Sequence, residues 1–164
     1  EPLNFEFLEE AILRSCTIKG RIVEKDETEN GIRATLNFGH TLGHLIETHA
    51  GYGKYLHGEA VGLGMFFAAF VSWRYDNLKE NEWMKIKNYL RKILISIKLP
   101  PIDQNLFREM ILHDKKSQKQ SINFIMLSKL GESYINKETS VDMLWEEFKK
   151  FVEKFADFIE IELR

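Results

Sequence analysis

The chain has 164 residues, of which 44% are hydrophobic, and a formal net charge of -2. This length suits a single domain with a real core, and the charge lacks the basic excess of a nucleic-acid binder. A lone cysteine, Cys16, argues against a disulfide framework and favours a reducing, cytoplasmic location. The longest apolar run, residues 60–73, is too short to span a bilayer, so no membrane partner is expected.

Apolar periodicity predicts three long helices, over residues 5–28, 57–77 and 81–97. The second of these is apolar nearly all round, which is typical of a helix buried at the centre of a domain. Pro100 and Pro101 stop the third helix. Asp103 is then a suitable N-cap for a short helix that ends at Leu112.

Strands are predicted only in the C-terminal part of the chain. Residues 122–127 read as a strand, and Gly131 turns the chain toward a second short strand near residues 133–135. Ser140 would cap a final helix over residues 141–161. The expected fold is therefore mainly α, a single domain over residues 1–164 with a small β-hairpin that must pack on helices.

The most informative stretch, residues 33–65, holds four of the five histidines. His40 and His44 are one turn apart on one face of a predicted helix. His57 follows a turn at residues 51–53, and a helix-turn-helix hairpin would bring it back against the first pair. Three convergent imidazoles suit a divalent metal such as zinc. The alternative is a helical hairpin whose histidines are ordinary hydrogen-bonded residues.

Glycines strengthen the interpretation of this stretch as a site. Glycine costs helix stability, and it permits the close approach of a backbone or a ligand. The glycines concerned are Gly39, Gly43, Gly58, Gly62 and Gly64.

The same stretch resembles the signature of 3-dehydroquinate synthase, the second enzyme of the shikimate pathway. The matching residues are Arg33, Leu36, Asn37, Gly39, His40, Thr41, Gly43, His44, Ile46, Glu47, Gly51, Tyr52, Gly53, His57, Gly58, Glu59, Ala60, Val61, Gly64 and Met65. Before them, Cys16, Lys19, Val23, Asp26 and Glu27 also match, and Asp114, Lys115 and Lys116 match after them. The resemblance covers about two thirds of the chain.

The resemblance implies separate roles for the three histidines. His40 and His57 match the two histidine ligands of the family's metal, Zn²⁺ or Co²⁺. His44 matches an active-site histidine that lies near the substrate phosphate, where a histidine close to neutrality can shuttle protons. This assignment replaces the simpler interpretation in which His40 and His44 both bind the metal.

Basic and amide side chains match the family's substrate-binding residues. The resemblance places Lys19 and Arg33 at the substrate carboxylate, which an arginine can hold with two hydrogen bonds. Asn37 can donate to phosphate oxygens, and either Lys115 or Lys116 matches a lysine that contacts phosphate. Together with His44, the residues Lys19, Arg33 and Asn37 form the predicted catalytic set.

Three other polar residues receive more ordinary interpretations. Glu59 either orients a histidine or is a first-turn glutamate favoured by the helix dipole, and the second interpretation is preferred. His49 and His113 are interpreted as structural or solvated residues.

The family's reaction converts a sugar-acid phosphate, 3-deoxy-D-arabino-heptulosonate 7-phosphate (DAHP), into 3-dehydroquinate and phosphate by transient oxidation with NAD. This chain carries no glycine-rich nucleotide loop. The resemblance therefore implies a C-terminal metal- and substrate-binding domain, without the N-terminal NAD-binding domain and without cofactor-binding residues of its own. The family's third metal ligand is an upstream glutamate, so we expect the chain alone to bind zinc weakly and to be inactive. The parent enzyme is expected to be a homodimer.

Two alternatives stay open. One is another sugar-phosphate cyclase, which would keep the three histidines but alter the carboxylate contacts. Lys19 and Arg33 favour an acid substrate instead. The other is a non-enzymatic helical metal-binding module, in which His44, His49 or Glu47 completes a tight ligand set.

Overall fold

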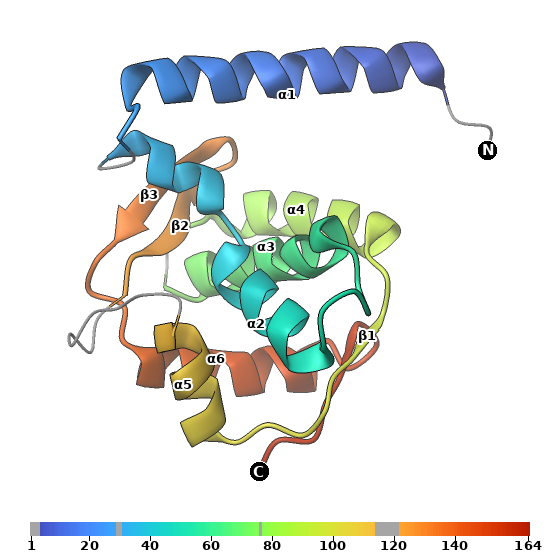
Figure 1. Ribbon diagram of the computed structural model, residues 1–164, viewed down its shortest axis with the longest axis vertical. Coiled ribbons are helices and arrows are strands. Elements are labelled where there is room, and N and C mark those ends of the chain that lie inside the picture. Colours follow the sequence, from blue (N-terminus) through green and yellow to red (C-terminus); the bar gives the residue numbers. More distant parts are fainter. Residues whose placement is uncertain (1–3, 29–30, 76, 114–121) are drawn as a thin grey trace. The chain divides into compact units, whose positions relative to one another are not determined.

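The structure is a computed structural model of the chain, and it describes residues 4–28, 31–75, 77–113 and 122–164. The chain divides into two compact units, residues 1–37 and 38–164. Both units are built mainly from helices, as the sequence predicts (Figure 1). Within the described residues, no helix combines the length and the apolar character that crossing a membrane requires.

The first unit consists of helix α1 (Phe5–Lys25) and a 3-10 helix, η1 (Ile32–Asn37). Helix α1 starts where the side chain of Asn4 accepts a hydrogen bond from the backbone N–H of Phe7, at 3.1 Å. The carboxylate of Asp26 then accepts from the backbone N–H groups of Gly31 (2.8 Å) and Arg33 (2.9 Å). Asp26 thereby holds the start of η1. The helix predicted over residues 5–28 is present and ends three residues earlier.

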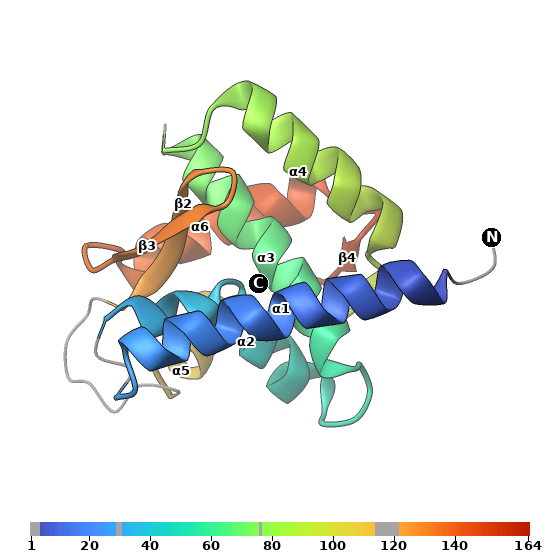
Figure 2. The same cartoon turned by 90° about the horizontal axis from the view of Figure 1, so that it is seen from above.

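The second unit is organised around helix α3 (His57–Arg74), which runs through its middle in Figure 2. The side chains of Phe66, Phe67 and Phe70 on α3 are each at most 1% exposed. Their rings lie 5.3–5.6 Å from the ring of Phe151, which belongs to helix α6 (Val141–Lys154). The other helices of this unit are α2 (His40–Ala50), α4 (Glu80–Ile93) and α5 (Gln104–His113). The expected central, buried helix is therefore confirmed.

Two of the predicted helix caps are confirmed by hydrogen bonds. The side chain of Asp103 accepts from the backbone N–H of Leu106 at 2.8 Å, directly before α5. The hydroxyl of Ser140 accepts from the backbone N–H of Met143 at 3.1 Å and starts α6.

The predicted β-hairpin is also present. Strands β2 (Phe124–Lys129) and β3 (Glu132–Asn136) pair antiparallel. Gly131, at the turn, has a φ of 85°, a conformation that glycine adopts without strain.

A second pair of strands was not predicted. Strand β1 (Ile97–Lys98) pairs in parallel with β4 (Ile159–Glu160), near the C-terminus. The prediction of a helix over residues 141–161 is therefore wrong at its end, because α6 stops at Lys154. Buried Phe155, Phe158 and Ile159 continue the apolar spacing of α6, so the pattern alone does not show where the helix ends.

The backbones of helices α2 and α3 come into direct contact. Gly39 has a φ of 85° and is the N-cap of α2, which begins at His40. A Cβ atom on Gly64 would lie 1.9 Å from the carbonyl oxygen of Gly39. A Cβ atom on Gly43 would lie 3.0 Å from the side chain of Val61. Gly39, Gly43 and Gly64 thus let the two helices pack without intervening side chains, whereas Gly58 and Gly62, which the sequence also singles out, do not take part in this contact.

This contact generates a stability prediction. We expect Gly64→Ala to lower the free energy of unfolding by roughly 2–4 kcal/mol, because the new methyl group must displace the Gly39 carbonyl. Gly58→Ala is the matched control, since a Cβ atom there meets nothing within 4 Å. The control should stay within about 1 kcal/mol of wild type or be more stable. Urea unfolding measures both, and equal free energies for the two variants would contradict the close contact.

Candidate metal centre

Three imidazole rings gather on one side of the α2–α3 hairpin. His40 is the first residue of α2, His44 lies one turn later, and His57 is the first residue of α3. The ring centroids are 5.3 Å apart for His40 and His57, 5.5 Å for His40 and His44, and 6.4 Å for His44 and His57. The hairpin therefore brings the three histidines together, as the spacing in the sequence predicts.

One ring nitrogen of His40 is shielded from solvent. Its Nδ1 atom is buried and has no hydrogen-bond partner within the described chain. Burial is the largest effect and lowers the pKa of His40 below the ordinary value of 6.5. The neighbouring rings of His44 and His57 lower it further, whereas a contact with the backbone of Phe38 and the charge of Glu47 partly oppose the shift. His40 is thus favoured as a neutral imidazole, the form that binds a metal.

His57 is held by a carboxylate on the opposite helix. Its Nδ1 atom lies 3.1 Å from one carboxylate oxygen of Glu47 and 3.2 Å from the other. The His57 side chain is 58% exposed, whereas that of Glu47 is only 20% exposed. The contact occupies Nδ1 and leaves Nε2 of His57 for another partner.

The separation of His40 and His57 fits a shared divalent metal. Zinc binds imidazole nitrogen at about 2.0–2.1 Å, so two rings on one tetrahedral ion have centroids about 5 Å apart. The observed distance is 5.3 Å. In the part of the chain that the structure describes, no group of three or more His, Cys, Asp or Glu side chains could hold a metal ion. A site made of His40 and His57 alone would need further ligands to complete a coordination shell.

The other predicted site residues belong to the first unit. Lys19 is exposed on α1, and Asn37 is the exposed last residue of η1. Arg33 is partly buried, and its Nη1 atom donates to the carbonyl oxygen of Glu27 at 2.6 Å. Lys115 and Lys116 lie outside the described residues.

Glu59 and His49 behave as interpreted from the sequence. The carboxylate of Glu59 accepts from the backbone N–H of Leu56 at 2.8 Å, so Glu59 caps the start of α3 and does not contact a histidine ring there. The Nε2 atom of His49 lies 2.9 Å from the carbonyl oxygen of Pro100, which is a structural contact. His113 ends α5, and its side chain is outside the described part.

Glu47 is the residue whose position the sequence-based prediction missed. It was weighed only as a possible extra ligand of a metal-binding module. The available signal was its spacing, because positions 40, 44 and 47 lie on one helical face. Its contact with His57 depends on how α2 and α3 pack, and spacing alone does not give that.

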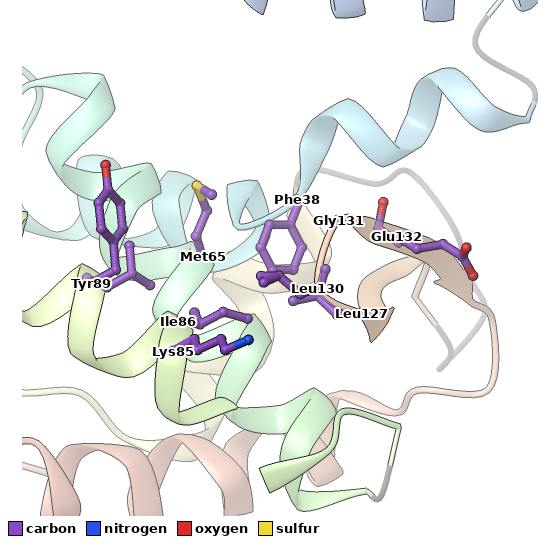
Figure 3. Close-up of a pocket in the computed structure, with 11 residues that line it drawn as sticks. Phe38, Met65, Lys85, Ile86, Tyr89, Leu127, Leu130, Gly131 and Glu132 are labelled. Carbon is purple, nitrogen blue, oxygen red and sulfur yellow. The ribbon is translucent and has the colours of Figure 1, made fainter. Parts of the chain in front are cut away.

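An apolar pocket of about 530 Å³ lies elsewhere in the second unit (Figure 3). Phe38, Met65, Ile86 and Leu127 are among its lining residues, and Lys85 and Glu132 are the charged ones. None of the predicted site residues lines it. Its walls are mostly apolar, so the histidine cluster is the better candidate for a metal or polar ligand.

Comparison with solved structures defines the class of fold. The chain superposes on a crystal structure of 2-deoxy-scyllo-inosose synthase with a TM-score of 0.70 and 25% identity, covering 88% of this chain and 41% of that one. It also matches 2-epi-5-epi-valiolone synthase from Streptomyces hygroscopicus subsp. jinggangensis 5008, solved with NAD⁺ and Zn²⁺ bound. There the TM-score is 0.63 and the identity 17%, over 82% of this chain and 37% of that one. The fold is that of the sugar-phosphate cyclases.

Sequence comparison then gives the family. The family model described as "3-dehydroquinate synthase C-terminal" matches residues 2–117. The 3-dehydroquinate synthase of Psychrobacter arcticus is 44% identical over 142 residues, which are 87% of this chain and 37% of that protein. The 3-dehydroquinate synthase of Acinetobacter baylyi is 42% identical over 137 residues, which are 84% of this chain and 38% of that protein. The chain belongs to the 3-dehydroquinate synthase C-terminal family and spans less than half the length of these relatives.

The pKa of His40 generates a prediction about acid stability. Below about pH 6.5 the unfolded chain takes up a proton at His40 more readily than the folded chain, so acidification favours unfolding. We expect the free energy of unfolding, measured with urea in the presence of a chelator, to fall between about pH 7 and about pH 5. The fall should be shallower in His40→Gln. The same slope in both proteins would show that His40 is not the group concerned.

Proposed function

We propose that this chain is the metal- and substrate-binding part of a 3-dehydroquinate synthase, which converts DAHP into 3-dehydroquinate and phosphate in the shikimate pathway. The observation that carries the proposal is the His40–His57 pair, with its ring centroids 5.3 Å apart. The pair supports a metal-assisted reaction. Curated relatives named 3-dehydroquinate synthase, 40–44% identical to this chain, support the choice of reaction.

His40 and His57 would hold the metal, Zn²⁺ or Co²⁺. When bound, the ion supplies Lewis-acid chemistry at the substrate hydroxyl that is oxidised. Burial around Nδ1 of His40 supports this role, because it disfavours the protonated ring, which cannot bind a metal. The exposed His57 leaves the pair accessible from solvent.

His44 would act on the substrate rather than on the metal. The centroid of the His44 ring lies 6.4 Å from that of His57, whereas the centroid of the His40 ring lies 5.3 Å from it. An imidazole beside the metal pair can take or give a proton close to neutral pH. We therefore assign His44 to proton transfer near the substrate phosphate.

Arg33, Lys19 and Asn37 would bind the two anionic ends of the substrate. Arg33 makes two hydrogen bonds. Its backbone N–H donates to the carboxylate of Asp26 (2.9 Å), and its guanidinium donates to the carbonyl oxygen of Glu27 (2.6 Å). A guanidinium fixed in this way is suited to a carboxylate, and it loses less freedom when it binds. Lys19 is proposed for the same carboxylate, and Asn37 for the phosphate, together with Lys115 or Lys116.

NAD would be bound mainly by an N-terminal domain, and both the cofactor and a homodimeric assembly are proposed for the complete enzyme. The solved structure of 2-epi-5-epi-valiolone synthase, which shares the fold, contains NAD⁺ and Zn²⁺. A cytoplasmic location is proposed with the activity. Neither nucleic acid nor a membrane is proposed as a partner.

The two alternatives are less well supported. Another sugar-phosphate cyclase shares the fold, but Arg33 and Lys19 favour an acid substrate. A self-sufficient metal-binding module requires a third donor, and the described residues contain no group of three that could hold a metal.

Zinc titration by calorimetry tests the metal assignment. We expect weak binding by the 164-residue chain, no measurable binding in His40→Ala or His57→Ala, and wild-type affinity within about threefold in His44→Ala. Tight binding that is lost in His44→Ala would contradict the assignment and favour the metal-binding module.

Turnover tests the reaction. The natural gene product that carries this chain should release phosphate from DAHP in the presence of NAD and zinc, whereas the 164-residue chain alone should not. Arg33→Lys should lower kcat/KM for DAHP at least about tenfold, because an ammonium group cannot replace a two-point guanidinium contact. A preference for glucose 6-phosphate, which lacks the carboxylate, would instead support another cyclase.

A further inference from the structure

We propose that Glu47 is a positioning residue that orients His57 toward the metal and fixes the location of its ring proton. The inference rests on the proposed metal-binding function, and it assigns a role to a residue outside the predicted catalytic set. Glu47 would act through His57 and would not itself be a metal ligand.

The contact joins two helices. Glu47 lies in the second turn of α2, whereas His57 is the first residue of α3, and the turn at residues 51–53 separates them. Both carboxylate oxygens of Glu47 lie close to the same ring nitrogen, at 3.1 and 3.2 Å. Because Glu47 is mostly buried and His57 is mostly exposed, the carboxylate provides a fixed point for a ring that otherwise faces solvent.

The chemistry of the two groups determines which nitrogen carries the proton. An ionised carboxylate only accepts hydrogen bonds, so Nδ1 of His57 must donate. A neutral imidazole has one ring proton, and its other nitrogen then has a free lone pair. With the proton on Nδ1, Nε2 becomes the metal-binding atom. Carboxylate–histidine–metal arrangements of this kind orient the ring and raise its basicity.

Two other roles for Glu47 explain the contacts less well. A simple ion pair with protonated His57 would contribute little, since more than half of the His57 side chain is exposed. If Glu47 were itself a metal ligand, its carboxylate would have to release His57. Glu47 is also not part of any three-donor group among the residues that the structure describes.

Glu59 provides a matched control. It is only two residues from His57 in sequence, but its carboxylate accepts from the backbone N–H of Leu56 at 2.8 Å. Removing either glutamate subtracts one negative charge from the neighbourhood of His57. Only the loss of Glu47 removes the hydrogen bond to the ring.

The experiment is long-range ¹H–¹⁵N NMR of the histidine rings in the 164-residue chain, at about pH 8, where free imidazole is neutral. Spectra are recorded for wild type, Glu47→Leu, Glu47→Gln and Glu59→Leu, without metal and during titration with Zn²⁺ alone. His57→Ala assigns the ring signals and shows whether zinc uses this residue. Urea unfolding of each variant identifies any that do not fold, and Glu47→Gln is the milder replacement.

We expect the wild-type His57 to carry its proton on Nδ1, and Glu47→Leu to lose this preference and to bind zinc 10- to 100-fold more weakly. Glu47→Gln keeps an oxygen that can accept, so it should retain more affinity than Glu47→Leu. Glu59→Leu should keep both the proton position and the zinc affinity, although it is less stable.

Failure of this inference can be told apart from failure of the proposed function. If His57→Ala weakens zinc binding but Glu47→Leu changes neither the proton position nor the affinity, the role of Glu47 is overturned while the metal assignment stands. If neither His57→Ala nor His40→Ala changes zinc binding, the metal assignment fails and the role of Glu47 fails with it.

Discussion

The contact between α2 and α3 at Gly39 and Gly64 sets the distance between the two helices. A side chain at Gly64 would collide with the Gly39 carbonyl, at 1.9 Å, so the packing requires glycine there. The same hairpin carries all three clustered histidines, His40 and His44 on α2 and His57 on α3. The geometry of the candidate metal centre therefore depends on a contact that involves no histidine.

The histidine cluster is costly for the folded chain, as a functional site often is. The rings of His44 and His57, with centroids 5.5 and 5.3 Å from that of His40, disfavour protonation of His40, and the burial of its Nδ1 atom costs free energy on folding. A bound metal would offset both costs, because it uses the neutral rings. Unfavourable interactions are thus concentrated in the histidine cluster, whereas the surrounding aromatic core packs in the usual way. This is the pattern expected of a site maintained for function.

Much of the fold could be predicted from the sequence, because the signals were local. Asp103 and Ser140 cap helices where they were expected to, and Gly131 makes the turn of the hairpin. Strands β1 and β4 were missed because each has only two residues and is defined by pairing with a segment about sixty residues away. Local periodicity contains no such information.

The candidate site could be predicted from the residues only in part. Spacing predicted that His40, His44 and His57 would meet, but the proposal that His40 and His57 bind a metal and His44 does not came from the resemblance to 3-dehydroquinate synthase. The role proposed for Glu47 depends on how α2 and α3 pack, which spacing alone does not give. Glu59, the more obvious candidate beside His57, caps its own helix instead.

X-ray absorption spectroscopy at the zinc edge of the zinc-loaded chain tests the central claim most directly, because it counts the imidazoles on the metal. The account predicts two imidazole ligands at about 2.0–2.1 Å, with oxygen completing the shell, in both the wild type and His44→Ala. Three imidazoles in the wild type, or one in His44→Ala, would contradict it.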